Sequence, residues 1–234
     1  MINFDKIIKE VIDNEACRTI DKIDQAIEEK DLEKVSKLHK ENVKGKQGFH
    51  DFAVRWVNLT LKYLHKYGGD EAVLDCMKEY AQTFYPPVIR NWIEGYEKGV
   101  LEPKDFPFEE FIKNRATLWQ MVHDNIQKWH VDEDKITFIL DPCNSGGYLV
   151  SECADETVIT DNAHNWTYNR KFQCYCLNCT TMWEFGWYEW YGWPLFIMEV
   201  PEVGSEGKCK MVMYKDPSNI PDEYYDKRNL TRKI

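Results

Sequence analysis

The spacing of apolar residues changes near residue 131, and this change constrains the fold more than any other feature of the chain. Before it, apolar residues recur about every 3.6 positions with charged residues between them, which predicts amphipathic helices. After it, three short apolar segments, 135–140, 195–200 and 209–214, roughly alternate and predict strands. A turn over 201–207 favours an antiparallel hairpin. The sequence therefore predicts an α+β protein, with a helical region (1–130) packed on a small antiparallel-sheet domain (131–234).

Breaks rich in glycine and proline divide the first region into helices, and two aspartates, Asp31 and Asp70, are of the type that caps helix N-termini. A turn is expected from Gly45 to Gly48, and a helix end at Gly68. The expected helices cover residues 3–29, 31–38, 49–67, 70–84 and 108–129, with a shorter one near 88–96. The third is expected to bury the side chains of Phe52, Trp56, Leu59 and Tyr63. Residues 180–191 fit either a helix or a strand, and a helix is favoured.

The acidic composition excludes some classes of partner. A formal net charge of −10 disfavours nucleic-acid binding, which depends on Lys and Arg neutralising phosphates. No stretch approaches the ~20 apolar residues that a membrane span needs, and the charged N-terminus does not resemble a signal peptide. We therefore expect a cytoplasmic protein whose eight cysteines are reduced, so that metal binding is favoured over disulfides.

Three of the eight cysteines fall within residues 174–179, and they suggest a zinc site. Cys176-x-x-Cys179 has the spacing with which two thiolates bind one tetrahedral zinc ion. Cys143 and His164 lie upstream and would complete a Cys3His set. With four protein ligands the zinc is structural. If Cys143 or His164 is not a ligand, a water molecule can take the open position and be activated.

Other interpretations of these cysteines remain open. Cys174 or Cys209 could replace one of the four ligands. The thiols could also be unligated, because free cysteine is commonly a small buried apolar residue. A redox-active Cys-x-x-Cys is less favoured, since no βαβ pattern surrounds it.

Two further features could contribute to a ligand site. Ser145 lies in the Asn-Ser-Gly-Gly stretch after Cys143, where backbone amides could form an anion nest, although an ordinary turn is the simpler interpretation. Trp183 and Trp187 lie on one face of the expected helix over 180–191. They predict either a core stripe or the aromatic wall of a substrate pocket.

His50 and His123 are candidate general acids or bases, because histidine changes charge near neutral pH. Each precedes an aspartate in an expected helix, and neighbouring helical residues do not face each other. Without an identifiable partner, each could equally be a half-buried histidine with no catalytic role.

The end of the chain resembles known small-molecule-binding domains. Residues 192–195 (Gly-Trp-Pro-Leu), 199–200 (Glu-Val) and 207–212 (Gly-Lys-Cys-Lys-Met-Val) are similar to the 4-vinyl reductase type of domain and to the L-2-amino-thiazoline-4-carboxylic acid hydrolase family. The chain departs from the pattern at Val203, near which another family cysteine is expected. The resemblance implies small-molecule binding and a hydrolase-like reaction.

These features together predict a zinc-dependent enzyme that acts on a small polar molecule. The resemblance to the hydrolase family implies its reaction class, a hydrolase or lyase that cleaves a C–N or C–S bond. His50 or His123 would act as acid or base, beside a pocket lined by Trp183 and Trp187. The alternative is a non-catalytic small-molecule sensor with a structural zinc. A homodimer formed through the long N-terminal helix is a third alternative.

Overall fold

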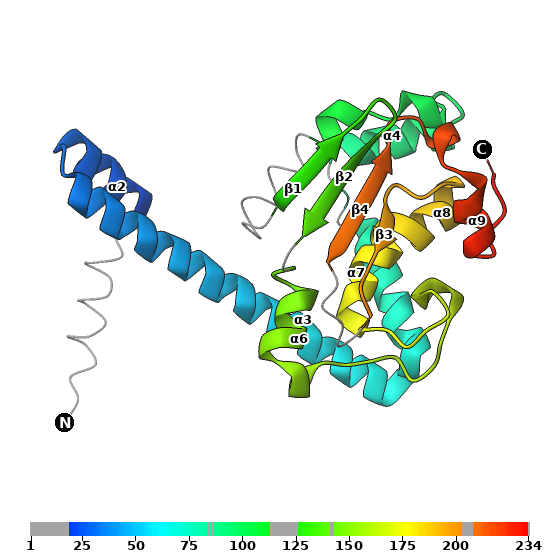
Figure 1. The fold of residues 1–234 in the computed structure, drawn as a ribbon, viewed down its shortest axis with the longest axis horizontal. Helices are drawn as coiled ribbons and strands as arrows, with labels where there is room; N and C mark the ends of the chain where they lie inside the picture. The colour runs from blue at the N-terminus through cyan, green and yellow to red at the C-terminus, as the bar shows by residue number, and fades with distance from the viewer. Residues whose placement is uncertain are drawn as a thin grey trace. The chain divides into compact units, whose positions relative to one another are not determined.

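The computed structural model describes residues 19–83, 85, 87–112, 126–140, 143–202 and 208–233 (Figure 1). The chain divides into two compact units, 1–52 and 53–234, and the boundary between them falls within a helix. The division near residue 130 that the sequence predicted stays a prediction. The α+β class is confirmed, because helices accompany a four-stranded antiparallel sheet of order β1-β2-β4-β3. Among the described residues, no helix is both long and apolar enough to cross a membrane.

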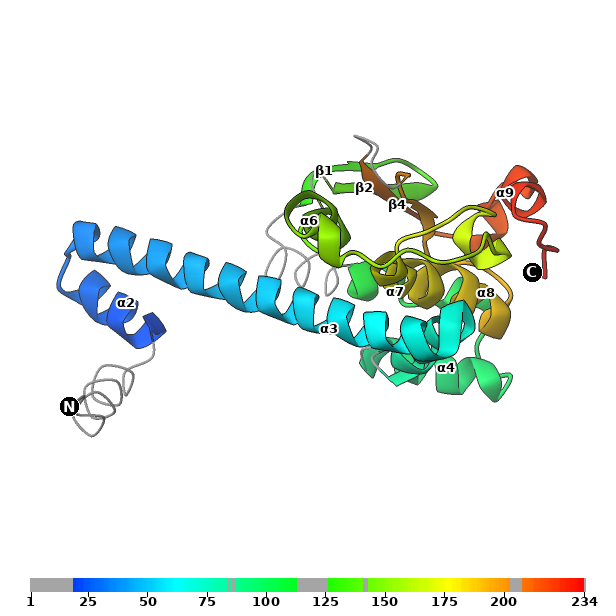
Figure 2. The ribbon, with the colours of Figure 1, turned by 90° about the horizontal axis from the view of Figure 1, so that it is seen from below.

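The helices α2 (Thr19–Glu28) and α3 (Leu32–Thr83) begin the described chain. Asp31 caps α3 as predicted, since its Oδ1 accepts a hydrogen bond from the backbone N–H of Lys34 at 2.9 Å. Figure 2 shows α3, which has 52 residues.

The predicted turn between Gly45 and Gly48 is wrong, because α3 continues through both. An internal glycine costs a helix only about 1 kcal/mol, so its neighbours can hold the helix together. The predicted interruption farther along is present at Gly69, whose φ of 70° and ψ of −166° are non-helical. The positive φ explains why glycine stands there.

The predicted burial of one face of α3 is also wrong. Four of its side chains are 50–64% exposed, namely Phe52, Trp56, Leu59 and Tyr63. In the second unit, Val54 and Leu61 are buried instead, seven residues apart on another face, and Asn58 between them donates to the Glu156 carbonyl at 2.8 Å. Both faces of α3 carry apolar residues, so hydrophobic spacing could not tell which one is buried. A homodimer stays a prediction.

The three predicted strands are confirmed as β2 (Lys135–Leu140), β3 (Ile197–Glu199) and β4 (Cys209–Tyr214), and β3 pairs antiparallel with β4. A fourth strand, β1 (Ile126–Val131), pairs with β2. The prediction of a helix up to residue 129 is therefore wrong over 126–129.

One face of the sheet is buried. Ile136 and Phe138 of β2 lie opposite Met213 and Met211 of β4, and Met211 is also opposite Met198 of β3. Residues directly opposite each other project from the same face, and all five side chains are buried. This face packs in one core with aromatic residues from the helices.

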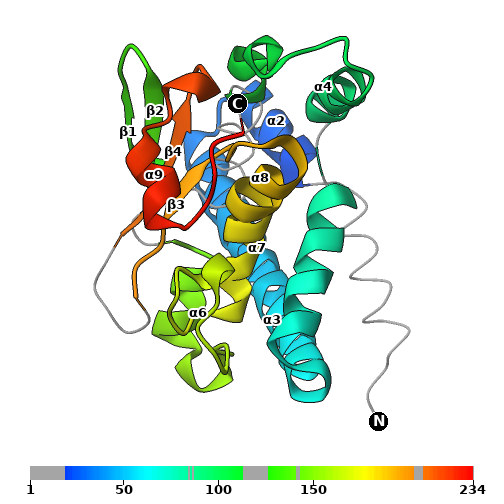
Figure 3. The same ribbon diagram turned by 90° about the vertical axis from the view of Figure 1, so that its right-hand side faces the viewer.

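The helix predicted over 180–191 is confirmed, in three consecutive segments: α7 (Leu177–Thr180), η5 (Thr181–Phe185) and α8 (Gly186–Tyr191). The segment η5 is a π-helical turn, and a side chain at Gly186 would place its Cβ 2.4 Å from the Thr181 carbonyl oxygen. Glycine is therefore required where the turn closes. Figures 1 and 3 show α7 and α8 along one face of the sheet.

A buried ion pair joins η5 to the C-terminal segment. Glu184 is fully buried and accepts hydrogen bonds from Arg228 Nε at 2.6 Å, the Tyr168 hydroxyl at 2.7 Å and the Met198 N–H at 3.0 Å. The Arg228 guanidinium also lies over the Tyr224 ring, 4.4 Å from its centroid. Arg228 follows helix α9 (Asp222–Lys227), so this pair holds the end of the chain against the core.

Short elements complete the described chain. The α-helices are α4 (Pro87–Glu97) and α6 (Gly146–Glu152). The 3-10 turns are η1 (Pro103–Asp105), η2 (Ala154–Glu156), η3 (Asn165–Thr167), η4 (Cys174–Cys176) and η6 (Pro217–Asn219).

Candidate functional site

Four cysteines from three chain segments form a cluster in the second unit. Strand register brings the first two together: Cys209 opens β4 opposite Leu140, the last residue of β2, and Cys143 follows three residues later. The thiols of Cys143 and Cys209 are hydrogen-bonded to each other.

Cys176 and Cys179 supply the third segment. Cys176 ends η4 and Cys179 lies in α7, and a three-residue spacing places both on one side of the helical backbone. Cys176 Sγ lies against α6, because a Cβ built on Gly146 would be only 2.6 Å from it. Cys176 can therefore approach α6 this closely only because residue 146 is a glycine.

Hydrogen bonds favour ionisation of Cys143. The Cys209 thiol donates to its sulfur, and the backbone amides of Gly147, Ser145 and Gly146 also donate, while burial acts in the opposite direction. The net result is a pKa of the Cys143 thiol well below its usual range. The amides of residues 145–147, which the sequence allowed as an anion nest beside the simpler interpretation of an ordinary turn, thus face a sulfur of the protein's own chain.

Two other thiols of the cluster, those of Cys176 and Cys209, are held in the neutral form. Burial raises the pKa of Cys176, and the nearby Cys143 and Cys179 sulfurs raise it further. The hydrogen bond to Cys143 raises the pKa of Cys209, and burial adds to this. Without a cation, ionisation of Cys143 is therefore favoured over ionisation of Cys176 or Cys209.

The donor chemistry of the cluster fits zinc, whereas its spacing is wider than bound zinc requires. Four thiolates around one zinc ion lie about 3.8 Å apart. In the part of the chain that the structure describes, no three of the four sulfurs all lie within 4.8 Å of one another. Zinc binding would require the sulfurs to move closer together.

His164 lies outside this cluster, in a second group of polar residues. Its Nε2 is 2.7 Å from Asp70 Oδ2, its Nδ1 is 3.9 Å from Glu71 Oε1, and its ring stacks on Trp166 at 4.6 Å. The structure therefore does not bring His164 together with Cys143, as the predicted Cys3His set requires. Cys209, which the sequence allowed as a replacement ligand, is the fourth member instead.

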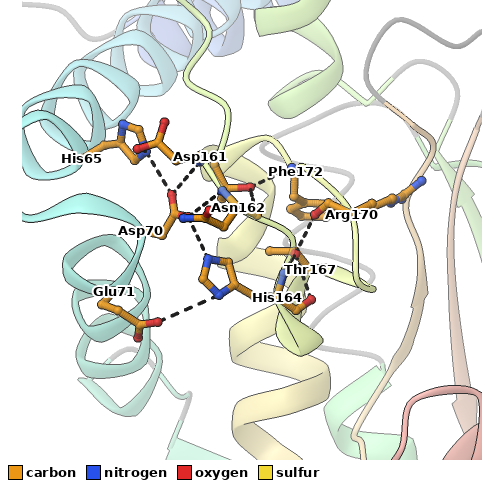
Figure 4. Close-up of polar contacts among 10 residues, drawn as sticks. His65, Asp70, Glu71, Asp161, Asn162, His164, Thr167, Arg170 and Phe172 are labelled. Carbon is orange, nitrogen blue, oxygen red and sulfur yellow. Dashed lines mark hydrogen bonds and ion pairs between the residues drawn. The ribbon is translucent and has the colours of Figure 1, made fainter.

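Asp70 is the centre of the second group (Figure 4). Its Oδ1 is 3.0 Å from His65 Nε2 and accepts from the Asp161 N–H at 2.9 Å, and its Oδ2 accepts from the Asn162 N–H at 3.0 Å in addition to meeting His164. Asp70 follows the interruption of α3 at Gly69, which lets its side chain turn toward the 161–164 loop. The N-cap prediction missed these contacts because they are long-range.

Burial alone raises the pKa of the Asp70 carboxyl group, but the hydrogen bonds outweigh it. Those from His164, from the Asp161 and Asn162 amides and from His65 together lower the pKa to about 2. Each of these bonds favours the ionised carboxylate. Asp70 is therefore charged throughout the physiological pH range.

This depressed pKa predicts a specific acid sensitivity. A carboxyl group whose pKa falls from 3.8 in the unfolded chain to about 2 in the folded protein adds stability above pH 3.8, and this is lost as the pH falls toward 2. The loss should be about 2 kcal/mol. Urea unfolding across this range should show the loss in the wild type and not in Asp70→Asn. Asp75→Asn, an exposed change on the same helix, should retain it, and equal slopes for all three proteins would contradict the prediction.

The remaining predicted site residues occupy different places. His50 is buried in the first unit, and its Nδ1 is 3.3 Å from Asp51 Oδ1, the neighbour expected to point elsewhere. His123 lies outside the described residues. Ser145 is buried and hydrogen-bonded to Tyr175. None of these placements identifies an acid or base beside the cysteines.

The two predicted pocket tryptophans lie in the core of the second unit. Trp183 is 1% exposed and Trp187 is 0% exposed. The ring of Trp187 packs against Tyr85, Trp92 and Trp193, with centroids 5.3–5.9 Å apart. Of the two interpretations left open by the sequence, the structure favours the core stripe.

No family model, no curated protein and no solved structure matches the chain. The resemblance to the reductase and hydrolase families, with the activity that it implies, therefore stays a prediction.

Proposed function

We propose that the second unit is a small-molecule-binding domain in which Cys143, Cys176, Cys179 and Cys209 hold one structural zinc ion. The observation that carries the proposal is the convergence of four cysteines from three segments of the chain. Four thiolates are a common ligand set for structural zinc. None of the four cysteines forms a disulfide.

The electrostatics of the cluster support a cation. Neighbouring sulfurs raise the pKa of Cys176 and Cys209, so the thiols oppose one another's ionisation. A divalent ion reverses this effect, because it stabilises several thiolates at once. The amides that donate to Cys143 would remain as hydrogen bonds to a zinc-bound sulfur, an arrangement that orients metal ligands.

The zinc would fasten the start of α6 and the first turn of α7 to the adjacent ends of β2 and β4. The small-molecule part of the proposal rests on the resemblance of residues 192–212 to the 4-vinyl reductase type of domain. A non-catalytic sensor is favoured over an enzyme, because a zinc ion with four thiolate ligands has no open position for water.

A metal-dependent enzyme is the second candidate: a hydrolase or lyase that cleaves a C–N or C–S bond in a small polar molecule. The spacing of the sulfurs favours it, since a set that is wider than bound zinc requires could close around the metal with only three members. The zinc would then keep a position at which water is activated. The two candidates differ in whether Cys209 binds the metal.

The test measures zinc content and affinity in the full-length protein, with Cys76→Ser as the matched control outside the cluster. The wild type and the control should each bind about one zinc ion. Cys179→Ser and Cys209→Ser should each lower the affinity at least about tenfold.

Two other outcomes are informative. A folded, metal-free wild type with all eight thiols titratable would end the zinc proposal. If Cys179→Ser loses zinc and Cys209→Ser retains it at full affinity, the metal has three cysteine ligands and the enzyme becomes the better candidate.

A further inference from the structure

We propose that His65, Asp70 and Asp161 bind a divalent cation at a second site, independent of the cysteine cluster, and leave part of its coordination sphere open. Figure 4 shows the three side chains pointing toward one another from α3 and from the 161–164 loop. Their ligand atoms all lie within 4.8 Å of one another, an arrangement that no other His, Cys, Asp or Glu trio shows among the described residues.

The distances fit an ion with little movement of the side chains. His65 Nε2 is 3.0 Å from Asp70 Oδ1 and 3.5 Å from Asp161 Oδ2. Ligand atoms about 2.1 Å from a metal ion lie about 3.0–3.4 Å apart in octahedral or tetrahedral geometry. The two measured distances span this interval, so the histidine is already placed for both carboxylates.

The hydrogen bonds around Asp70 resemble those that orient metal-binding carboxylates in other proteins. A cation bound by Asp70 Oδ1 would replace only the proton shared with His65. The hydrogen bonds from the Asp161 and Asn162 amides and from His164 would remain. Such outer hydrogen bonds hold a ligating carboxylate in a fixed orientation. The stacking of His164 on Trp166 in turn fixes the ring that supports Asp70.

A cation also resolves a mismatch between donors and acceptors. The Nε2 atom of His65 faces carboxylate oxygens of both Asp70 and Asp161, and an N–H at this position can donate a straight hydrogen bond to only one of them. A divalent ion in the position of that proton attracts both carboxylates.

The ligand types indicate the class of ion and the openness of the site. One imidazole and two carboxylates suit Mn²⁺, Fe²⁺ or Zn²⁺, whereas soft metals prefer thiolates. The side chain of Asp161 is 71% exposed, so the site opens to solvent on that side. Three protein ligands leave coordination positions for water or for a ligand, as in catalytic metal sites.

The probe is Mn²⁺ alone, titrated into the full-length protein and followed by its electron paramagnetic resonance signal, because Mn²⁺ prefers oxygen and nitrogen to thiolate ligands. The wild type should bind one Mn²⁺. Asp161→Asn should bind it at least about tenfold more weakly. Its fold should not change, since the exposed carboxylate is altered while the backbone N–H that holds Asp70 remains.

Asp155→Asn is the matched control, because it removes the same charge from another exposed carboxylate of the second unit. It should leave Mn²⁺ affinity unchanged. The proposal is overturned if the wild type shows no saturable binding, if Asp161→Asn binds as tightly as the wild type, or if Asp155→Asn weakens binding equally.

Discussion

Replacing Arg228 with methionine is expected to lower the free energy of unfolding by about 3–5 kcal/mol. The change leaves the Glu184 carboxylate fully buried, with neutral hydrogen-bond donors such as the Tyr168 hydroxyl and the Met198 N–H but without the cation that pairs with it. A buried charge without its partner is among the most destabilising features that a single substitution can create. Urea unfolding at neutral pH measures the effect.

The matched control is Arg55→Met. Arg55 pairs with Glu156 at the surface, where both side chains are more than 40% exposed, so its loss should cost far less stability than the loss of Arg228. In the double variant Glu184→Gln with Arg228→Met, part of the stability should return, because no charge is then buried. The explanation is wrong if Arg228→Met unfolds as the control does.

The deficit of Arg228→Met should also depend on pH. Burial raises the pKa of Glu184 above 4.5, and the charge of Arg228 is the first of the effects that lower it, so the variant raises this pKa further. A carboxyl group with a raised pKa in the folded state favours folding below its unfolded pKa, and this contribution is lost as the pH rises through the folded value. The variant should therefore approach the wild type in stability as the pH falls toward the unfolded pKa of 4.5. A deficit that does not change with pH would contradict this explanation.

Replacing Trp187 with alanine is expected to cost about 3–5 kcal/mol. The side chain is fully buried, and its ring contacts Tyr85, Trp92 and Trp193. Truncation leaves a cavity among rigid rings that cannot collapse to fill it. Trp56→Ala is the matched control, because Trp56 is 64% exposed, and it should change stability by no more than about 0.5 kcal/mol. A small loss for Trp187→Ala would instead support the predicted role of this ring in a ligand pocket.

Local patterns predicted the elements that depend on local interactions. The alternation over 135–140 and 209–214 predicted two strands that are present, and the side chain of Asp31 caps its helix as its residue type suggests. The strand at 126–131 was missed because it is stabilised by pairing with β2. The residues of β1 themselves do not show that β2 will pair with them.

The candidate sites show the same limit. Cys176 and Cys179 could be identified from their spacing, because three residues of helix bring them together. Cys209 joins them through the register of β2 and β4, which no local spacing reveals. Asp70 was interpreted as a helix cap, whereas its contacts with the 161–164 loop cross about 90 residues of chain.

The π turn over Thr181–Phe185 holds one residue more than an α turn, yet it rotates the helix by nearly the same angle. If one residue were deleted here, the turn would revert to α-helix and the close approach that requires glycine at position 186 would disappear. The rings of Trp187 and Tyr191 would keep their contacts with Trp92. A deletion in the regular helix that follows would instead rotate later residues by about 100° and turn Tyr191 away from Trp92. The π turn is therefore a position at which the chain can shorten by one residue without a change in the aromatic core of the second unit.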